Sequence, residues 1–190
     1  MPTTPPSRPV LLVMDFQNGI VERLGNTEVL AAAGRAVDAA RAAGVPVMFV
    51  RVAFRSGYPE IAEANRSFGA LKQAHGGMTE DDSATQVHAS LEPRSDEPVV
   101  LKRRVSAFSG SDLDVLLRAA GADTLVLAGI ATSGVVLSTL RQAADLDYRL
   151  TVLADACADG DPEVHRVLTE KVFPRQAAVT TAEEWAAGLA

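Results

Sequence analysis

The stretch DTLVLAGIATSGVVLSTLRQAADLDY, residues 123–148, decides the fold of this chain. Residues 124–129 form an apolar run suited to a buried parallel strand, and an amphipathic helical pattern covers residues 133–147. The connection contains five small residues, namely Gly129, Ala131, Thr132, Ser133 and Gly134. In an open α/β sheet, ligands bind where the carboxyl end of a strand leads into a helix, whose first N–H groups attract anions. We therefore expect the chemistry of this protein at this turn.

The same alternation of strand and helix runs along the whole chain. Apolar runs predict further strands at 10–14, 45–52, 98–101, 149–154 and 177–180, and helical patterns occupy 28–43, 112–120, 161–172 and 182–189. This alternation predicts an α/β fold, a three-layer α/β/α sandwich with a six-stranded, mainly parallel sheet. Residues 54–97 show only a weak helical pattern, at 61–75, and we interpret this long connection as a lid over the site.

Length and charge narrow the class of protein. The 190 residues fit one domain, which we place at 9–190, and the proline-rich start, 1–8, is expected to be a short disordered leader. A net charge of −6 argues against a nucleic-acid or anionic membrane partner. No apolar stretch approaches the ~20 residues that span a bilayer, and a single cysteine, Cys157, fits a reducing compartment. The sequence therefore predicts a cytoplasmic protein with no membrane partner.

Two ionisable residues end predicted strands: Asp15 follows 10–14, and Lys102 follows 98–101. Because parallel strands present their carboxyl ends at one edge of a sheet, both can face the turn after Gly129. A lysine keeps a nearby carboxylate charged, whereas an apolar pocket raises its pKa and makes it a usable acid. The two residues are either a catalytic pair or ordinary strand-end charges that reach solvent.

Three motifs in this order carry a family resemblance: LLVMDFQ at 11–17, VVLKRRVSAF at 99–108 and LVLAGIATSGVVLSTLRQA at 125–143. The chain resembles the isochorismatase-like (cysteine hydrolase) superfamily, which includes nicotinamidases, N-carbamoylsarcosine amidases and isochorismatases. That resemblance implies a Rossmann-like six-stranded sheet, in agreement with the pattern above. It also implies a hydrolase that acts on a small molecule and assembles as a homo-oligomer, a dimer or tetramer.

The family's amidase branch works with an aspartate, a lysine and a cysteine, and the resemblance maps the first two onto Asp15 and Lys102. The cysteine position falls on Val135, whose side chain cannot attack an amide. Cys157 follows the next predicted strand, and we interpret it as a small, partly buried thiol. The resemblance further implies a cis peptide bond before Ala131, with the N–H groups of Ala131 and Val135 forming an oxyanion hole.

One branch of the superfamily works without the cysteine. Isochorismatases carry glycine at that position and hydrolyse a vinyl ether, with the aspartate protonating the enol carbon. Their lysine motif resembles KRRVSAF here, including the basic residue Arg104. The resemblance therefore predicts that Asp15 acts as an acid or base on a small cyclic metabolite, without a covalent cysteine intermediate. Both a neutral and an anionic metabolite are compatible with this prediction.

Several side chains are candidates for substrate contact, each with a structural alternative. Four aromatic residues follow strand ends and form either a wall for a flat ligand or ordinary packing: Phe16, Phe54, Tyr58 and Phe108. Gln17, in the first motif, is a further candidate for substrate contact. Arginines form either a carboxylate site or a solvated surface: Arg51, Arg55, Arg103 and Arg104. Ser133 is either a replacement nucleophile or the N-cap of the following helix. The histidines are scattered, so we predict no metal and no cofactor.

Two other functions remain open from the sequence. The first is a catalytically silent member of the family that binds a ligand or a partner chain. The second is an amidase or esterase that uses Ser133 as its nucleophile.

Overall fold

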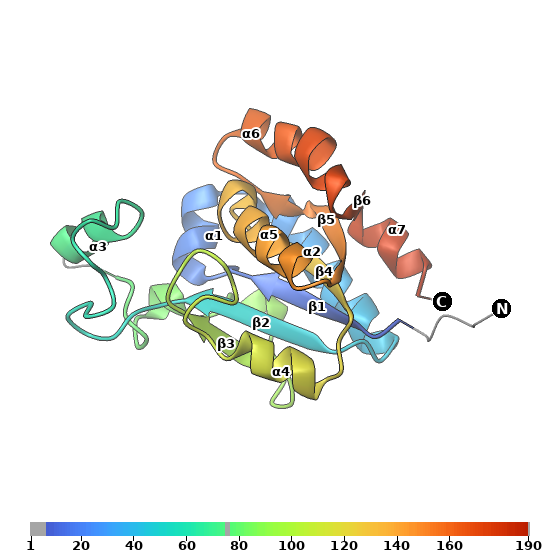
Figure 1. Ribbon diagram of the computed structural model, residues 1–190, viewed down its shortest axis with the longest axis horizontal. Coiled ribbons are helices and arrows are strands. Elements are labelled where there is room, and N and C mark those ends of the chain that lie inside the picture. The colour runs from blue at the N-terminus through green and yellow to red at the C-terminus, as the bar shows by residue number, and fades with distance from the viewer. Residues whose placement is uncertain (1–6, 75–76, 190) are drawn as a thin grey trace.

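A computed structural model describes residues 7–74 and 77–189 of the chain. Six parallel strands form one sheet in the order β3-β2-β1-β4-β5-β6 (Figure 1). The strands are β1 (Pro9–Met14), β2 (Val47–Val52), β3 (Val99–Lys102), β4 (Thr124–Ile130), β5 (Arg149–Ala158) and β6 (Ala178–Thr180). The predicted α/β/α class and six-stranded sheet are confirmed, and every strand pair is parallel.

Helices cover both faces of this sheet. They are α1 (Asn18–Leu24), α2 (Thr27–Ala42), α3 (Gly69–Ala74), α4 (Leu113–Ala119), α5 (Leu137–Asp145), α6 (Pro162–Val167) and α7 (Ala182–Ala187). On one face, α2 and α7 pack against alternate residues of β1 such as Leu11 and Val13. On the other face, α4 and α5 pack against Leu12 and Met14. This division follows from the period of two along a strand, which sends successive side chains to opposite faces.

The helices and strands differ from the predicted ranges in five main places. Helix α1 was not predicted at all. The weak helical pattern at 61–75 yields only α3, and residue 75 lies outside the described residues. The helix predicted at 133–147 begins with one π-helical turn, Thr132–Val136, before α5, and the helix predicted at 161–172 ends with a similar turn, Leu168–Val172. Strand β5 continues beyond 154 and contains Cys157, which therefore does not follow the strand as expected.

The central pair of strands, β1 and β4, positions the turn that leads into α5. Met14 pairs with Gly129 in the parallel register. A Cβ atom at Gly129 would lie 3.0 Å from the carbonyl oxygen of Met14 and 3.1 Å from Val136 Cγ2. Glycine is therefore required at position 129 for β1, β4 and the following turn to approach this closely.

The segment between β2 and β3 projects from the carboxyl edge of the sheet, with α3 at its far end (Figure 1). It also contains two short 3-10 turns, Ser83–Thr85 and Ala89–Leu91. Residues 1–6 of the expected leader lie outside the described residues, whereas Ser7 Oγ and Thr124 Oγ1 are hydrogen-bonded at 2.8 Å and the Arg8 N–H donates to Asp123. Within the described ranges, no helix is long and apolar enough to cross a membrane.

Candidate active site

Asp15 and Lys102 form a buried ion pair at the carboxyl edge of the sheet. Asp15 directly follows β1 and has a left-handed backbone (φ 60°), a conformation that aspartate tolerates better than most residues. Lys102 is the last residue of β3. Its Nζ lies 2.9 Å from Asp15 Oδ2, although β2 separates the two strands in the sheet. The two side chains therefore do not reach solvent as separate strand-end charges.

The environment of Asp15 makes its carboxyl group a weaker acid than that of an exposed aspartate. The side chains of Asp15 and Lys102 are only 8% and 1% exposed. Burial raises the pKa of the Asp15 carboxyl group, and the charge and hydrogen bond of Lys102 oppose that rise without cancelling it. Asp15 Oδ1 has no hydrogen-bond partner among the described residues, whereas Lys102 also donates to the carbonyl oxygen of Arg104 at 3.0 Å. One carboxyl oxygen of Asp15 is thus available to a ligand.

The turn after β4 lies beside this pair. The peptide bond between Ile130 and Ala131 is cis, as the family resemblance implied. Ala131, Gly134 and Val135 border the same cavity as Asp15 and Lys102. Val135 is buried, and its isopropyl group packs into the core under α5. The position onto which the family resemblance maps a cysteine is therefore occupied by a packed, chemically inert side chain.

Two side chains of the β5–α6 region hold this turn in place. The Ser133 N–H donates to Asp159 Oδ2 at 2.7 Å, and Thr132 Oγ1 lies 2.8 Å from His165 Nδ1. Burial acts to raise the pKa of Asp159, but hydrogen bonds from Ser133 and nearby N–H groups lower it on balance, so Asp159 accepts as a carboxylate. Ser133 itself is exposed and is not among the described residues that line the cavity. Ser133 is not the N-cap either: Ala131 holds that position, no side chain caps the turn from it, and the Ser133 N–H is bound by Asp159 instead.

The cavity above the ion pair measures about 500 Å³. Its wall is mostly apolar and comes from α1, the end of β2, the lid segment, the β3–α4 connection and the turn after β4. The apolar side chains are Ile20, Leu24, Val52, Phe68, Ala70, Met78, Val105, Ile130 and Val135. Such a mostly apolar cavity with a few polar groups is typical of a small-molecule site. Val135 lines it without closing it.

The aromatic residues proposed as a ligand wall are packed elsewhere. Phe16 lies in the core beneath α2. Phe54 and Tyr58 form a small cluster with Phe68, and Phe108 packs against Tyr148. None of the four predicted aromatics is among the described residues that line the cavity. The aromatic residue that lines the cavity is Phe68, which the sequence analysis did not single out.

Gln17 is buried and ties the carboxyl ends of β1 and β2 to the lid. Its Nε2 donates to the carbonyl oxygens of Val52 and Thr85, each at 2.9 Å, and its Oε1 accepts from the Val52 N–H at 2.8 Å. The amide is therefore fully used within the protein. Gln17 positions the strand ends rather than facing the cavity.

The four candidate arginines also make contacts within the protein. Arg104 donates to the carbonyl oxygens of Glu60 and Arg103. Arg103 pairs with Glu80 and lies 3.6 Å from Glu60, Arg55 pairs with Glu60 at 2.6 Å, and Arg51 donates to the Glu80 carbonyl oxygen at 3.1 Å. The contacts of Arg103 and Arg104 fasten the lid to the β3–α4 connection, Arg51 joins β2 to the lid, and the Arg55–Glu60 pair lies within the lid. They do not place a guanidinium group on the cavity wall.

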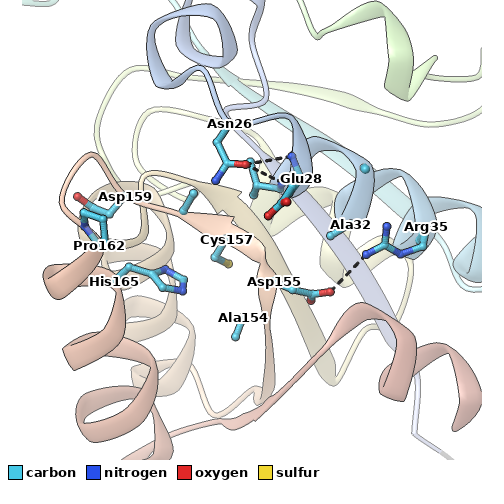
Figure 2. Close-up of a pocket in the computed structure, with 13 residues that line it drawn as sticks. Asn26, Glu28, Ala32, Arg35, Ala154, Asp155, Cys157, Asp159, Pro162 and His165 are labelled. Atoms are coloured by element: carbon cyan, nitrogen blue, oxygen red, sulfur yellow. Dashed lines mark hydrogen bonds and ion pairs between the residues drawn. The ribbon is translucent and has the colours of Figure 1, made fainter.

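A second cavity, of about 520 Å³, lies between the start of α2 and the β5–α6 region (Figure 2). Cys157 borders it, but the thiol is nearly inaccessible, and burial raises its pKa to about 12. A thiol with this pKa is almost entirely un-ionised at neutral pH and is a poor nucleophile. Asp159 and His165 line the same cavity, so their side chains connect it to the turn after β4. Among the residues that the structure describes, no three His, Cys, Asp or Glu side chains gather as a metal site.

The sequence analysis missed α1 and its contribution to the cavity. Ile20, Arg23 and Leu24 lie at the helical spacing i, i+3, i+4 and all line it. Gly25, with its left-handed φ of 65°, ends the helix and was the available signal for its C-terminus. A seven-residue helix contains too few periodic positions for its pattern to stand out.

The fold and this site define a class: an α/β/α protein with a buried acid–lysine pair at the carboxyl edge of a parallel sheet, under a small-residue turn. Comparison with known proteins assigns the family. Residues 9–184 match the Isochorismatase domain, and the chain belongs to the isochorismatase family.

Named relatives and a solved structure agree with this assignment. The chain is 35% identical to ureidoacrylate amidohydrolase RutB of Methylobacterium radiotolerans, over 85% of this chain and 71% of that protein. It is 36% identical to phenazine biosynthesis protein PhzD1 of Pseudomonas aeruginosa, over 94% and 85%. An isochorismatase family protein from Burkholderia thailandensis superposes with a TM-score of 0.84 at 28% identity, covering 96% of this chain and 95% of that one. The family includes hydrolases.

Proposed function

We propose that this protein hydrolyses a small cyclic metabolite by acid–base chemistry at Asp15, without a covalent cysteine intermediate. The observation that carries the proposal is the buried Asp15 carboxyl group, which is paired with Lys102 on one oxygen and has its other oxygen without a partner among the described residues. The adjoining cavity of about 500 Å³ has room for one ring-sized ligand.

The proposed reaction is the hydrolysis of an enol ether. Protonated Asp15 donates its proton to the enol carbon, which converts the enol ether into an oxocarbenium ion. Water adds to the cationic carbon, and the resulting hemiketal loses the alcohol and leaves a ketone. Asp15, now a carboxylate, regains a proton from the attacking water.

Two neighbouring features support this chemistry. The Lys102 ammonium stabilises the Asp15 carboxylate after it has donated its proton. The N–H groups of Ala131 and Val135 are the proposed donors to a carboxylate or carbonyl oxygen of the substrate, because the ether oxygen itself gains positive charge in this reaction. Neither role requires a heteroatom in the side chain at position 135.

A catalytically silent, ligand-binding protein is the second candidate, and Val135 is the observation that favours it. A valine at this position removes the covalent route. The amidase route through Ser133 has less support, because Ser133 is exposed and its N–H is bonded to Asp159. The variant Val135→Cys tests whether the rest of an amidase site is intact. Gain of amidase activity in this variant means that only the nucleophile is missing.

The deciding experiment compares wild type, Asp15→Asn and Cys157→Ala on three probes of different bond type. Isochorismate serves as the enol ether, benzamide as the amide and phenyl acetate as the ester. Release of pyruvate from isochorismate is followed with lactate dehydrogenase and NADH. The proposal predicts turnover of the enol ether that is lost in Asp15→Asn and kept in Cys157→Ala. Loss of turnover in Cys157→Ala overturns it, and ligand binding without turnover of any probe favours the silent protein.

We further propose that the chain acts in the cytoplasm as a single-domain subunit of a dimer or tetramer. The family resemblance supports the assembly, and the absence of a membrane-spanning helix among the described residues is compatible with the location. Light scattering during size-exclusion chromatography measures the subunit number, and a monomer at micromolar concentration contradicts the proposed assembly.

A further inference from the structure

One face of α1 contributes a cation to the wall of the active-site cavity. Ile20, Arg23 and Leu24 all line it, and Arg23 is the basic residue of the last turn of this helix. The two aliphatic side chains continue the apolar wall. Arg23 is therefore the charged residue among the lining residues that α1 contributes.

The charge of Arg23 is not used within the described part of the protein. In residues 7–74 and 77–189, no hydrogen bond or ion pair joins its guanidinium group to another residue. The four arginines that the sequence offered as carboxylate ligands differ in this respect, because each donates to the lid or its anchoring loop: Arg51, Arg55, Arg103 and Arg104. Arg23 is thus the arginine on the cavity wall with donors available to a ligand.

The other charges on the wall cancel each other. Asp15 and Lys102 pair at 2.9 Å and are almost fully buried at the base, whereas Arg23 is exposed at the mouth. Phe68, Met78 and Val105 belong to the same lining and are intermediate in exposure between the buried pair and Arg23. A complementary ligand has a reactive group at its deep end, an apolar ring in the middle and a negative charge at its outer end.

We infer that Arg23 is the residue that selects an anionic substrate, by binding a carboxylate at the mouth of the cavity while the scissile bond lies at Asp15. The inference rests on the proposed function for the identity of the reactive end. A guanidinium group is suited to this task because it presents a planar set of N–H donors to both oxygens of a carboxylate. The substrate class is therefore a cyclic carboxylic acid with its acid group remote from the bond that is cleaved.

The test uses two ring-sized probes that differ in charge and hardly in shape, benzoate and benzamide. Binding of each is measured by isothermal titration calorimetry with wild type, Arg23→Gln and Arg175→Gln. Arg175 is an exposed arginine outside the cavity lining, so its variant is the matched control for loss of one surface charge. Circular dichroism checks that both variants fold, which is expected because Arg23 has no partner in the described structure to lose.

We expect wild type to bind benzoate more tightly than benzamide. Arg23→Gln weakens benzoate binding about tenfold, as loss of one charge-assisted contact at an accessible position does, and leaves benzamide binding unchanged. Arg175→Gln changes neither. The salt dependence of benzoate binding is also smaller in Arg23→Gln, because exposed charges are screened.

Three outcomes overturn the inference: benzoate fails to bind wild type, Arg23→Gln binds benzoate as wild type does, or both probes weaken equally in that variant. A Lys102→Met variant supplies a further check, since loss of benzoate binding there together with retention in Arg23→Gln places the anion at the base instead. These measurements need no turnover. Failure of the Arg23 inference is therefore distinguishable from failure of the proposed acid chemistry, which Asp15→Asn tests separately.

Discussion

Replacing Asp15 by asparagine removes the negative charge from the base of the cavity while keeping the size of the side chain. Asparagine also tolerates the left-handed backbone at this position (φ 60°). The amide cannot donate a proton to carbon at a useful rate, so turnover falls by about 10²–10⁴ if Asp15 is the general acid. The backbone of the site stays in place, and the change isolates the proton and the charge.

The same change has a cost in stability that follows from the burial of Lys102. Its ammonium group is 1% exposed and loses its counter-ion 2.9 Å away. Removing one partner of a buried pair costs about 3–5 kcal/mol, and we expect about 3 kcal/mol because the asparagine oxygen and the Arg104 carbonyl oxygen still accept hydrogen bonds. For a chain of this length, that lowers Tm by about 6–12 °C.

Thermal unfolding and turnover are measured on wild type, Asp15→Asn, Lys102→Met and the double variant. The double variant buries no unpaired charge at this site, so we expect it to be more stable than Asp15→Asn and still inactive. A Tm within about 1 °C of wild type in Asp15→Asn refutes the buried ion pair, since that shift is below 1 kcal/mol. Unchanged turnover in the same variant refutes the acid role.

Three further predictions concern the surroundings of Asp15. The rate falls as pH rises through the raised pKa of Asp15, because the protonated form is the donor. The charge of Lys102 lowers this pKa, so Lys102→Met moves the basic limb of the kcat/KM profile to higher pH. A basic limb that does not move contradicts the assignment of Asp15 as the acid. Cys157→Ala leaves kcat unchanged and lowers the free energy of unfolding by about 1 kcal/mol, as removal of one buried atom does, measured by urea denaturation. Asp159→Ala removes the acceptor of the Ser133 N–H, which holds the turn after β4, and lowers kcat more than it raises KM. Equal effects on kcat and KM mean that the turn does not need the Asp159 contact.

Parts of the site could be predicted because strand ends are encoded locally. Asp15 and Lys102 each follow a short apolar run, and parallel pairing brings such positions to one edge of the sheet. The cis bond before Ala131 and the position of Val135 came from the family resemblance. Their geometry in the structure agrees with it, while their chemical roles remain predictions.

Other parts of the site could not be predicted because they depend on partners far away in the chain. The amide of Gln17 is used by Val52 and Thr85, which lie 35 and 68 residues further on. The guanidinium groups of Arg103 and Arg104 bind the lid at Glu80 and Glu60. Neither set of contacts has a signature in the surrounding sequence, so residues that looked available to a ligand are occupied.

The sequence by itself determined the six-stranded α/β sheet and the places of Asp15 and Lys102 at its edge, because strand periodicity and single residue identities are local properties. The missing cysteine at position 135 came from the family resemblance, and the pairing of Asp15 with Lys102 came from the structure. Only the tertiary structure decided that Arg23, rather than Arg51, Arg55, Arg103 or Arg104, lies on the cavity wall. Helix α1 is too short to be stable alone, and it forms because Ile20 and Leu24 pack against neighbouring clusters. That packing is what brings Arg23 to the wall of the cavity.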